Sequence, residues 1–357
     1  MKKTIPLVIL VIVIAASVFY FQNIKIDKSG LTVNEELNDS EGGPLGSVHP
    51  LSIAALRNGE YPGSDLTVEQ ELDGGSNYSR QIVSYKSEGL KIYALLTVPN
   101  GEAPEGGWPA IVFNHGYIPP DQYKTTERYI AYTDGFSRNG YVLIRPDYRG
   151  HGNSEGRAEG GYGSNAYTID VLNALSSIKK YKGVNPEKIG MWGHSMGGHV
   201  TLRSMVVSKD IKAGVIWAGV VASYPDLLSK WRRGNTTPTL DSQGQALLTP
   251  FPTNSNRGGW RRGLVDQYGT PESNPKFWNS ISANSYLVDI SGPLQLHHGT
   301  EDHSVPHEFS EILEKQMKDA KKEVELFIYP GDDHDIPLNF LTAMQRSIEF
   351  FDSKLKK

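Results

Sequence analysis

The sequence predicts an α/β fold, in which a mostly parallel central sheet is flanked by helices. From Tyr78 onward, short runs of β-branched and aromatic residues alternate with segments whose apolar residues recur at helical spacing. A Gly-Val-Asn-Pro turn at residues 183–186 separates one helical segment from the next strand-like run, and this order of helix, turn and strand is typical of parallel sheets. A long segment at about 222–286 interrupts the alternation and predicts an insertion.

Each element is predicted from its own residues. Short apolar runs predict strands at residues 90–98, 110–113, 141–144, 188–192, 213–217, 293–297 and 324–329. Apolar residues three or four positions apart predict helices around 171–178, at 200–207, at 309–317 and at the C-terminus. Insertions at the carboxyl ends of strands lie beside the ligand-binding crevice of such a sheet, so we expect residues 222–286 to form a cap there.

The first residues predict a targeting segment. Lys2 and Lys3 precede an apolar run at residues 5–21, and no clear cleavage site follows it. We expect residues 1–24 to be a membrane anchor or signal segment, with the rest of the chain extracytoplasmic, or secreted if the segment is cleaved. Residues 25–76 are rich in Gly, Ser, Asn and charge and predict a spacer before a folded domain at 77–357.

Composition excludes several classes of function. The 357-residue chain has a net charge of −4, so it lacks the basic surface that nucleic-acid binding requires. It contains no cysteine, which excludes thiolate metal sites, disulfides and a cysteine nucleophile. We therefore expect no nucleic-acid partner and no cofactor, and contact with a membrane only through the N-terminal segment.

Residues 193–198, Gly-His-Ser-Met-Gly-Gly, predict a sharp turn that presents a nucleophile. The turn lies between a predicted strand and a predicted helix. Gly193 and Gly197 stand two residues before and after Ser195, where bulky side chains would obstruct its hydroxyl. Ser195 is therefore the predicted nucleophile, and a glycine-rich turn without chemistry is the alternative.

A serine hydroxyl needs a base, and after such a turn the acid and then the base follow along the chain. We predict His334 as the base because it follows the last predicted strand. Asp302, in the loop after the preceding strand, is the predicted acid that orients it. Asp332 and Asp333 are rival acids, but they lie too close in sequence to His334 to meet its ring and suit a solvated loop. Glu301 is a weaker rival. Other histidines are interpreted as structural: His194, His199, His297 and His298.

Two backbone donors are predicted for an oxyanion, the negatively charged oxygen that forms when the nucleophile attacks a carbonyl. The N–H of Met196 directly follows the nucleophile. The N–H of Tyr117 is the second, because Gly116 lets the backbone approach closely after an early strand. The Tyr117 hydroxyl is a further candidate donor, and the alternative is that the Tyr117 ring only lines the wall of the pocket.

These motifs, with Pro-Asp-Tyr-Arg-Gly-His-Gly-Asn-Ser at residues 146–154, resemble the catalytic domain of the prolyl oligopeptidase family over residues 80–355. The resemblance implies the α/β-hydrolase fold and serine hydrolase chemistry. It also implies that Asp147 and Arg149 brace the loops near the nucleophile. Prolyl oligopeptidases carry a β-propeller before this domain, whereas this sequence has only about fifty spacer residues there.

We therefore expect a serine peptidase that cleaves small peptides, with a carboxylesterase acting on small acyl esters as the alternative. Arginines of the insertion suggest a preference for substrates bearing a carboxylate, unless they form a solvated basic rim: Arg232, Arg233, Arg261 and Arg262. A non-catalytic binding protein is disfavoured by the intact triad. No metal site is expected, because Pro306 disrupts the helical spacing of four histidines: His297, His298, His303 and His307.

Overall fold

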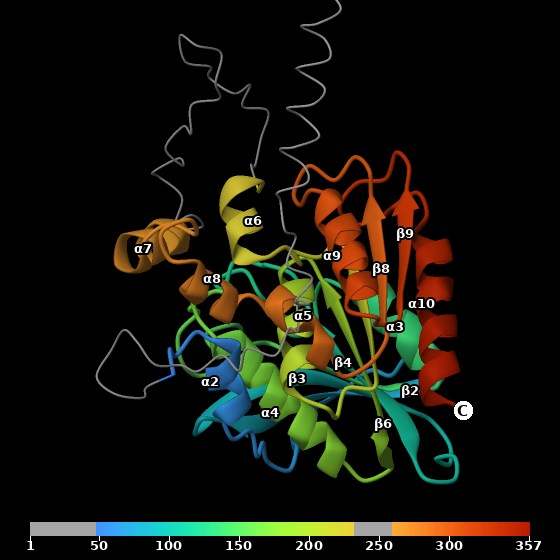
Figure 1. Cartoon of the computed structure of the whole chain (residues 1–357). Helices are drawn as coiled ribbons and strands as arrows, with labels where there is room; N and C mark the ends of the chain where they lie inside the picture. Colours follow the sequence, from blue (N-terminus) through green and yellow to red (C-terminus); the bar gives the residue numbers. More distant parts are fainter. Residues whose placement is uncertain (1–47, 232–258) are drawn as a thin grey trace, which may run out of the picture. The chain divides into compact units, whose positions relative to one another are not determined.

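The computed structural model describes residues 48–231 and 259–357, which belong to one compact unit that begins at Val48. Within these residues a nine-stranded sheet has the order β1-β2-β3-β5-β4-β6-β7-β8-β9 (Figure 1). The first three strands pair antiparallel, and the strands from β5 to β9 are parallel. The strands are β1 (Thr67–Leu72), β2 (Tyr78–Ser87), β3 (Leu90–Pro99), β4 (Trp108–Asn114), β5 (Val142–Pro146), β6 (Val184–His194), β7 (Ala213–Trp217), β8 (Leu294–Gly299) and β9 (Val324–Tyr329).

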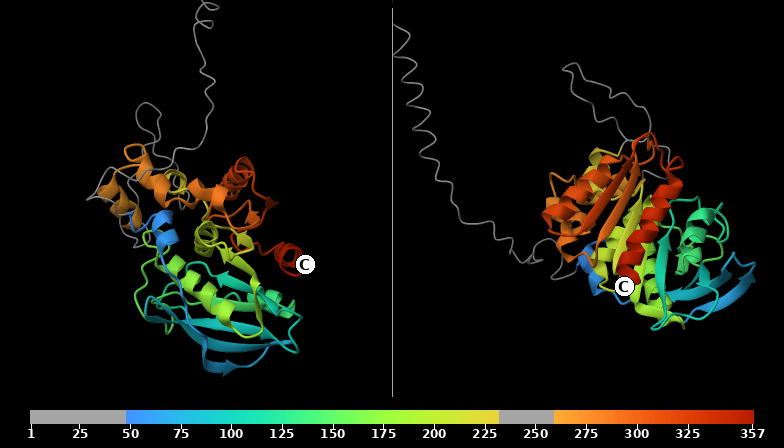
Figure 2. Two further views of the ribbon diagram at one scale, coloured as in Figure 1. Left: turned by 60° about the horizontal axis from the view of Figure 1, so that its bottom comes forward. Right: turned by 90° about the vertical axis from the view of Figure 1, so that its right-hand side faces the viewer.

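Helices cover both faces of the sheet, because alternate residues of its central strands are apolar on both sides. In β4, Ala110 and Val112 belong to one core, whereas Ile111 and Phe113 belong to a second core on the opposite face. The first core includes α4 and α5, and the second includes α3 and α10 (Figure 2). The helices are α2 (Ile53–Asn58), α3 (Ile130–Arg138), α4 (Ala166–Lys180), α5 (Met196–Val207), α6 (Tyr224–Ser229), α7 (Gly259–Tyr268), α8 (Pro275–Ile281), the 3-10 helix η1 (Ala283–Asp289), α9 (Glu308–Asp319) and α10 (Phe340–Leu355).

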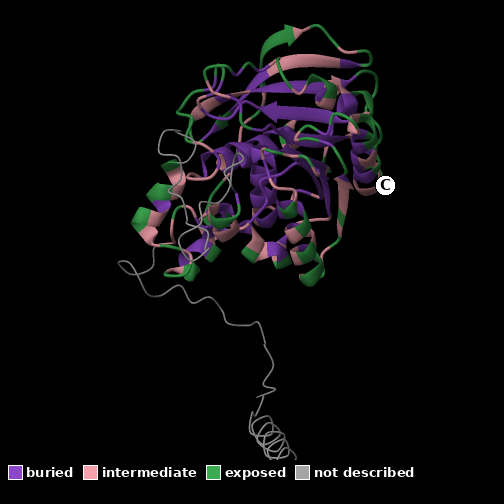
Figure 3. Cartoon of the chain, turned by 90° about the horizontal axis from the view of Figure 1, so that it is seen from above, coloured by how far each residue is buried: buried purple, intermediate pink, exposed green. Residues whose placement is uncertain are grey.

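The observed architecture confirms the predicted α/β fold with a mostly parallel central sheet. Strands β7 and β9 have the predicted bounds, and buried residues concentrate in the central strands (Figure 3). Strand β6 begins at Val184 instead of residue 188, because Val184 already pairs with Trp108 of β4. Part of the predicted turn at 183–186 therefore belongs to the strand.

The folded unit begins earlier than residue 77, the predicted start of the domain. Ser52 caps α2 through the N–H of Ala55, and two apolar side chains of α2, Ile53 and Leu56, are buried in the main core. Strand β1 pairs with β2 at the edge of the sheet. The described part of the predicted spacer at 25–76 is thus an integral part of the sheet and its helical layer, and not a free linker.

The structure contradicts the predicted location of the protein, anchored in a membrane or secreted. No helix within residues 48–231 and 259–357 is long and apolar enough to cross a bilayer. The segment at residues 1–24, on which that prediction depended, lies outside the described residues.

The predicted insertion at 222–286 falls between β7 and β8. Its described residues contribute four helices, α6, α7, α8 and η1, and no strand. Several of its side chains form a separate apolar cluster: Tyr224, Leu264, Phe277, Trp278 and Ile281. Residues 232–258, which include Arg232 and Arg233, lie outside the described residues. Its role as a cap remains a prediction.

Candidate active site

Ser195 occupies the sharp turn between β6 and α5. Its backbone has φ 55° and ψ −119°, a conformation that L-residues rarely adopt and that is typical of a strained strand-to-helix turn. A Cβ atom on Gly193 would overlap the carbonyl of Gly197, and one on Gly197 would overlap the carbonyl of Asn114. Backbone contacts therefore require both glycines. Met196 begins α5, where the first N–H groups have no partner within the helix.

Asp302 and His334 meet beyond the carboxyl ends of β8 and β9. His334 Nδ1 lies 2.7 Å from Asp302 Oδ2, and the Asp302 side chain is fully buried. Asp302 Oδ2 also lies 3.0 Å from His298 Nε2, and Oδ1 accepts backbone N–H groups from Ser304 and Val305. Burial favours the neutral acid, but hydrogen bonds with His298 and His334 outweigh it and hold the pKa of Asp302 well below its usual value.

The rival carboxylates have other partners. Asp332 is fully buried and accepts hydrogen bonds from Leu338 N–H and the Asn339 side chain, so its predicted place in a solvated loop was wrong. Asp333 accepts the N–H of His334 and not its ring. Of the predicted carboxylates, only Asp302 bonds the His334 ring.

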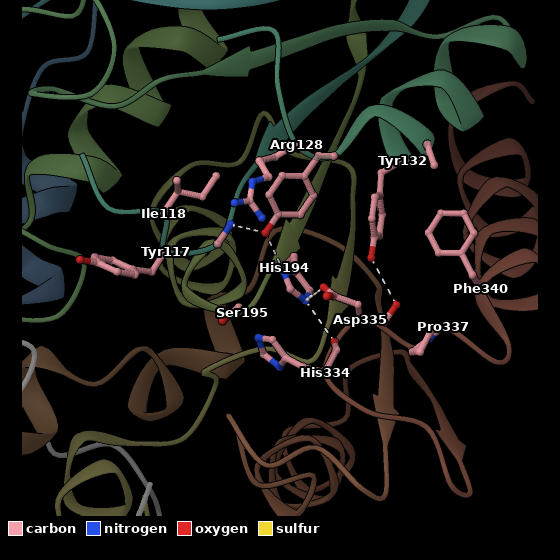
Figure 4. A pocket seen from close by; sticks show the side chains of 13 residues that line it. Tyr117, Ile118, Arg128, Tyr132, His194, Ser195, His334, Asp335, Pro337 and Phe340 are labelled. Carbon is pink, nitrogen blue, oxygen red and sulfur yellow. Dashed lines mark hydrogen bonds and ion pairs between the residues drawn. The ribbon is translucent and has the colours of Figure 1, made fainter. Parts of the chain in front are cut away.

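Ser195 and His334 line the same pocket, which has a volume of about 570 Å³ (Figure 4). Gly116 and Tyr117 also line it, and 43% of the Tyr117 residue surface is exposed. A Cβ atom on Gly116 would lie 3.1 Å from Ser195 Cβ, so the loop after β4 approaches the nucleophile closely. The lining residues are Gly116, Tyr117, Ile118, Arg128, Tyr129, Ala131, Tyr132, His194, Ser195, His334, Asp335, Pro337 and Phe340.

A chain of hydrogen bonds connects three loops of the pocket. The N–H of Gly116 donates to the Tyr129 hydroxyl at 2.9 Å, which in turn lies 2.8 Å from His194 Nδ1. His194 Nε2 lies 3.1 Å from the carbonyl oxygen of His334. Because that carbonyl can only accept, Nε2 carries the proton, and Nδ1 accepts from Tyr129. Burial, reinforced by the charge of His334, lowers the pKa of His194 to about 3 and keeps the ring neutral.

The sequence analysis interpreted His194 as structural and did not predict that its ring links the Tyr129 hydroxyl to the carbonyl of His334. One available signal was the twofold alternation of β6, which places His194 on the same face of the strand as Trp192. Tyr129 had no comparable signal, because it lies 65 residues from His194 in sequence.

Asp147 and Arg149 lie outside the lining of the pocket. Asp147 accepts hydrogen bonds from Tyr123 and Thr125, and its burial raises its pKa to about 6. Arg149 pairs with the buried Asp170 at 2.7 Å. Both residues join the segment at 146–154 to neighbouring elements, which agrees with the bracing role that the resemblance implies.

The four histidines considered as metal ligands do not gather. Within residues 48–231 and 259–357, no group of three or more His, Asp or Glu side chains could hold a metal ion. His297 bonds Tyr329 and Gln295, and His298 bonds Ser310 in addition to Asp302.

Arg261 of the insertion does not line the pocket. Its guanidinium stacks over Trp231 at 5.0 Å and over Trp260 at 5.3 Å, so it contributes to packing within the insertion. The predicted preference for a carboxylate therefore finds no support from this arginine.

Two family models match the chain. The model of the serine aminopeptidase S33 family matches residues 109–251, and that of the dienelactone hydrolase family matches residues 265–339. Among curated proteins, the uncharacterized peptidase YtmA of Bacillus subtilis is 24% identical over 256 residues, which cover 71% of this chain and 86% of YtmA.

Two solved structures have the same fold. The acylaminoacyl peptidase of Pyrococcus horikoshii has a TM-score of 0.60 at 24% identity, and the match covers 79% of this chain but only 43% of the peptidase. Est1E of Butyrivibrio proteoclasticus, solved with ferulic acid, has a TM-score of 0.55 at 21% identity and is covered over 99% of its length. The resemblance that the sequence predicted is thereby confirmed.

Proposed function

We propose that this chain, an α/β-hydrolase of the serine hydrolase type that resembles the catalytic domain of the prolyl oligopeptidase family, is a serine peptidase that cleaves small peptides. The observation that carries the proposal is the 2.7 Å contact between His334 Nδ1 and Asp302 Oδ2, beside a pocket that Ser195 and His334 share. These groups suit an acyl-enzyme mechanism in which Ser195 is the nucleophile, His334 the base and Asp302 the acid.

In this mechanism His334 Nδ1–H donates to Asp302, which leaves Nε2 free to accept the proton of Ser195. The serine oxygen attacks the substrate carbonyl, and the oxyanion receives hydrogen bonds from the N–H groups of Met196 and Tyr117. His334 then gives the proton to the departing amine, and the acyl group remains on Ser195. Water, deprotonated by His334, releases the acid and restores the serine.

A carboxylesterase acting on small acyl esters is the second candidate. It is favoured by the match to Est1E, which covers nearly all of that protein, whereas the acylaminoacyl peptidase is covered over less than half of its length. An ester differs at one step, because an alkoxide leaves with less help from the protonated His334 than an amine needs.

Paired amide and ester substrates with the same acyl group test the proposal. We expect turnover of aminoacyl arylamides as well as aminoacyl esters, and loss of both in Ser195→Ala. Ester cleavage without amide cleavage would select the carboxylesterase. Equal turnover in Ser195→Ala would reject serine chemistry altogether.

A further inference from the structure

We infer that Arg128 binds a carboxylate of the substrate, so that this hydrolase acts on esters or amides that carry a carboxylate near the scissile bond. The inference rests on the proposed function of the same pocket. Arg128 lines that pocket together with Ser195 and His334, and Figure 4 shows it between Ile118 and Tyr132 on one wall. It lies in the loop before α3, outside the insertion whose arginines the sequence singled out.

The backbone around Arg128 is held in an unusual conformation. Arg128 and Tyr129 have φ angles of 57° and 52°, so two consecutive non-glycine residues occupy the left-handed region. The buried Arg145 holds this bend by donating hydrogen bonds to the carbonyls of three loop residues: Thr125, Glu127 and Arg128. The Tyr129 hydroxyl bonds Gly116 and His194. Strained backbone that its surroundings enforce is often found at functional sites, and here it fixes where the Arg128 side chain begins.

The Arg128 guanidinium has no carboxylate partner in the part of the chain that the structure describes. Its sequence neighbour Glu127 pairs with Lys124 at 2.7 Å. Asp335 is the one acidic residue in the pocket lining, and its carboxylate lies 3.5 Å from His194 Nε2, whereas Tyr129, next to Arg128, bonds the Nδ1 side of that ring. A cation therefore lines the pocket without a carboxylate partner among the described residues.

The chemistry of the walls defines the rest of the ligand. Ile118, Tyr132, Pro337 and Phe340 supply apolar surface to the same pocket. A guanidinium forms two parallel hydrogen bonds with a carboxylate, and such charge-assisted pairs are stronger than bonds between neutral groups. The pocket therefore suits an apolar or aromatic acyl or leaving group that bears a carboxylate.

Two pairs of chromogenic esters test this inference. In the first pair, p-nitrophenyl hydrogen glutarate and p-nitrophenyl pentanoate, the carboxylate is on the acyl side. In the second pair, para-butanoyloxybenzoate and its methyl ester, it is on the leaving group. We expect Arg128→Gln to lower kcat/KM for the anionic member of at least one pair by about 10- to 100-fold while the neutral member changes less than about twofold. Arg128→Lys should retain part of the preference for the anionic ester, since lysine keeps the positive charge but lacks the two parallel N–H donors of the guanidinium.

Arg138→Gln is the matched control, because Arg138 lies at the other end of α3, is paired with Asp134 and does not line the pocket. It should leave both pairs unchanged. Equal losses for anionic and neutral members in Arg128→Gln, or no loss for either anionic ester, would overturn the inference. Labelling of wild-type Ser195 by a fluorophosphonate separates the two levels: a labelled enzyme without an Arg128-dependent preference refutes the inference alone, whereas an unlabelled Ser195 refutes the proposed function as well.

Discussion

At the scale of single residues, Asp302 combines full burial of its side chain with four hydrogen-bond partners. Two are the rings of His298 and His334, and two are the backbone N–H groups of Ser304 and Val305. These bonds outweigh the cost of burial and lower the pKa of the carboxyl, so it stays ionised wherever His334 acts as a base. The carboxylate can then fix the His334 ring and stabilise its protonated form.

Replacing this carboxylate should abolish most activity without unfolding the protein. In Asp302→Asn we expect kcat to fall by about a thousandfold or more, because the amide cannot stabilise the imidazolium of His334. Asp333→Asn is the control, since this side chain accepts the backbone N–H of His334 and does not contact its ring, and the substitution should lower kcat by less than about threefold. Steady-state kinetics with circular dichroism of both variants checks the prediction, and equal losses would contradict it.

Some single residues of the site could be predicted from the sequence and others could not. Asp302 and His334 follow consecutive parallel strands, whose carboxyl ends lie at one edge of the sheet, so their approach follows from topology. Arg128 and Tyr129 have left-handed backbone conformations. Glycine usually marks such positions in a sequence, and neither residue is a glycine. Their position depends on Arg145 of β5, which donates a hydrogen bond to the Arg128 carbonyl.

At the scale of elements, the hydrogen bonds from Gly116 through Tyr129 and His194 to His334 couple three loops. These loops follow β4, β6 and β9, and they carry the predicted oxyanion donor, the nucleophile and the base. Burial raises the pKa of Tyr129, so its hydroxyl stays protonated. The hydroxyl can then accept the N–H of Gly116 and donate to His194 Nδ1, while His194 Nε2–H donates to the carbonyl of His334. The hydroxyl of Tyr129 and the neutral ring of His194 therefore help to hold these three loops in place relative to one another.

Removing the Tyr129 hydroxyl should disturb catalysis beyond its effect on stability. In Tyr129→Phe we expect a loss of about 1–2 kcal/mol in the free energy of unfolding, and a roughly tenfold fall in kcat with KM little changed. In Tyr141→Phe, which loses a 2.6 Å bond to Asp352 outside the pocket lining, stability should fall by a similar amount with kcat unchanged. Denaturant unfolding and kinetics of both variants make the comparison, and parallel kcat losses would contradict the coupling.

The segment before β2 should be needed for folding. Arg203 of α5 is fully buried and donates a hydrogen bond to the Leu51 carbonyl, and β1 covers the edge of β2. A chain that starts at Asn77 would lack the Leu51 carbonyl that accepts from Arg203, and it would leave the edge of β2 unpaired. We expect it to be insoluble or to melt well below a chain that starts at Val48, as thermal denaturation would show. Equal melting temperatures would refute the view that this segment is integral.

Elements were predictable where apolar residues dominate. Strands β7 and β9 had the predicted bounds because each is a short run made up mainly of apolar residues. Strand β1, Thr-Val-Glu-Gln-Glu-Leu, is mostly exposed at the edge of the sheet and reads as a polar linker. Helix α3 contains a glycine and several polar residues, and its position depends on contacts with α10 at the far end of the chain.

At the scale of the whole molecule, the unit buries several histidines in their neutral form. Burial lowers the pKa to about 3 in each of three residues, His194, His199 and His297. In the unfolded chain each would titrate near 6.5. Between these values the unfolded state binds more protons, so stability must rise with pH and fall as the pH decreases below about 6.5.

We therefore expect the free energy of unfolding to fall by about 2–3 kcal/mol between about pH 7 and pH 5.5. Each histidine contributes on the order of 1 kcal/mol to this loss. Asp147 offsets part of it, because its pKa is raised to about 6 and the folded state takes up a proton there. Urea unfolding across this range measures the slope, which should decrease in His297→Gln, outside the pocket lining. Stability that increased on acidification would contradict the account.

The central claim is that Ser195 is a nucleophile activated by His334 and Asp302. Mass spectrometry after reaction with a fluorophosphonate tests it most directly. We predict one adduct, on Ser195, that is absent in Ser195→Ala and forms more slowly by at least about a hundredfold in His334→Ala. An adduct on another residue, or equally fast labelling of Ser195 in His334→Ala, would contradict it.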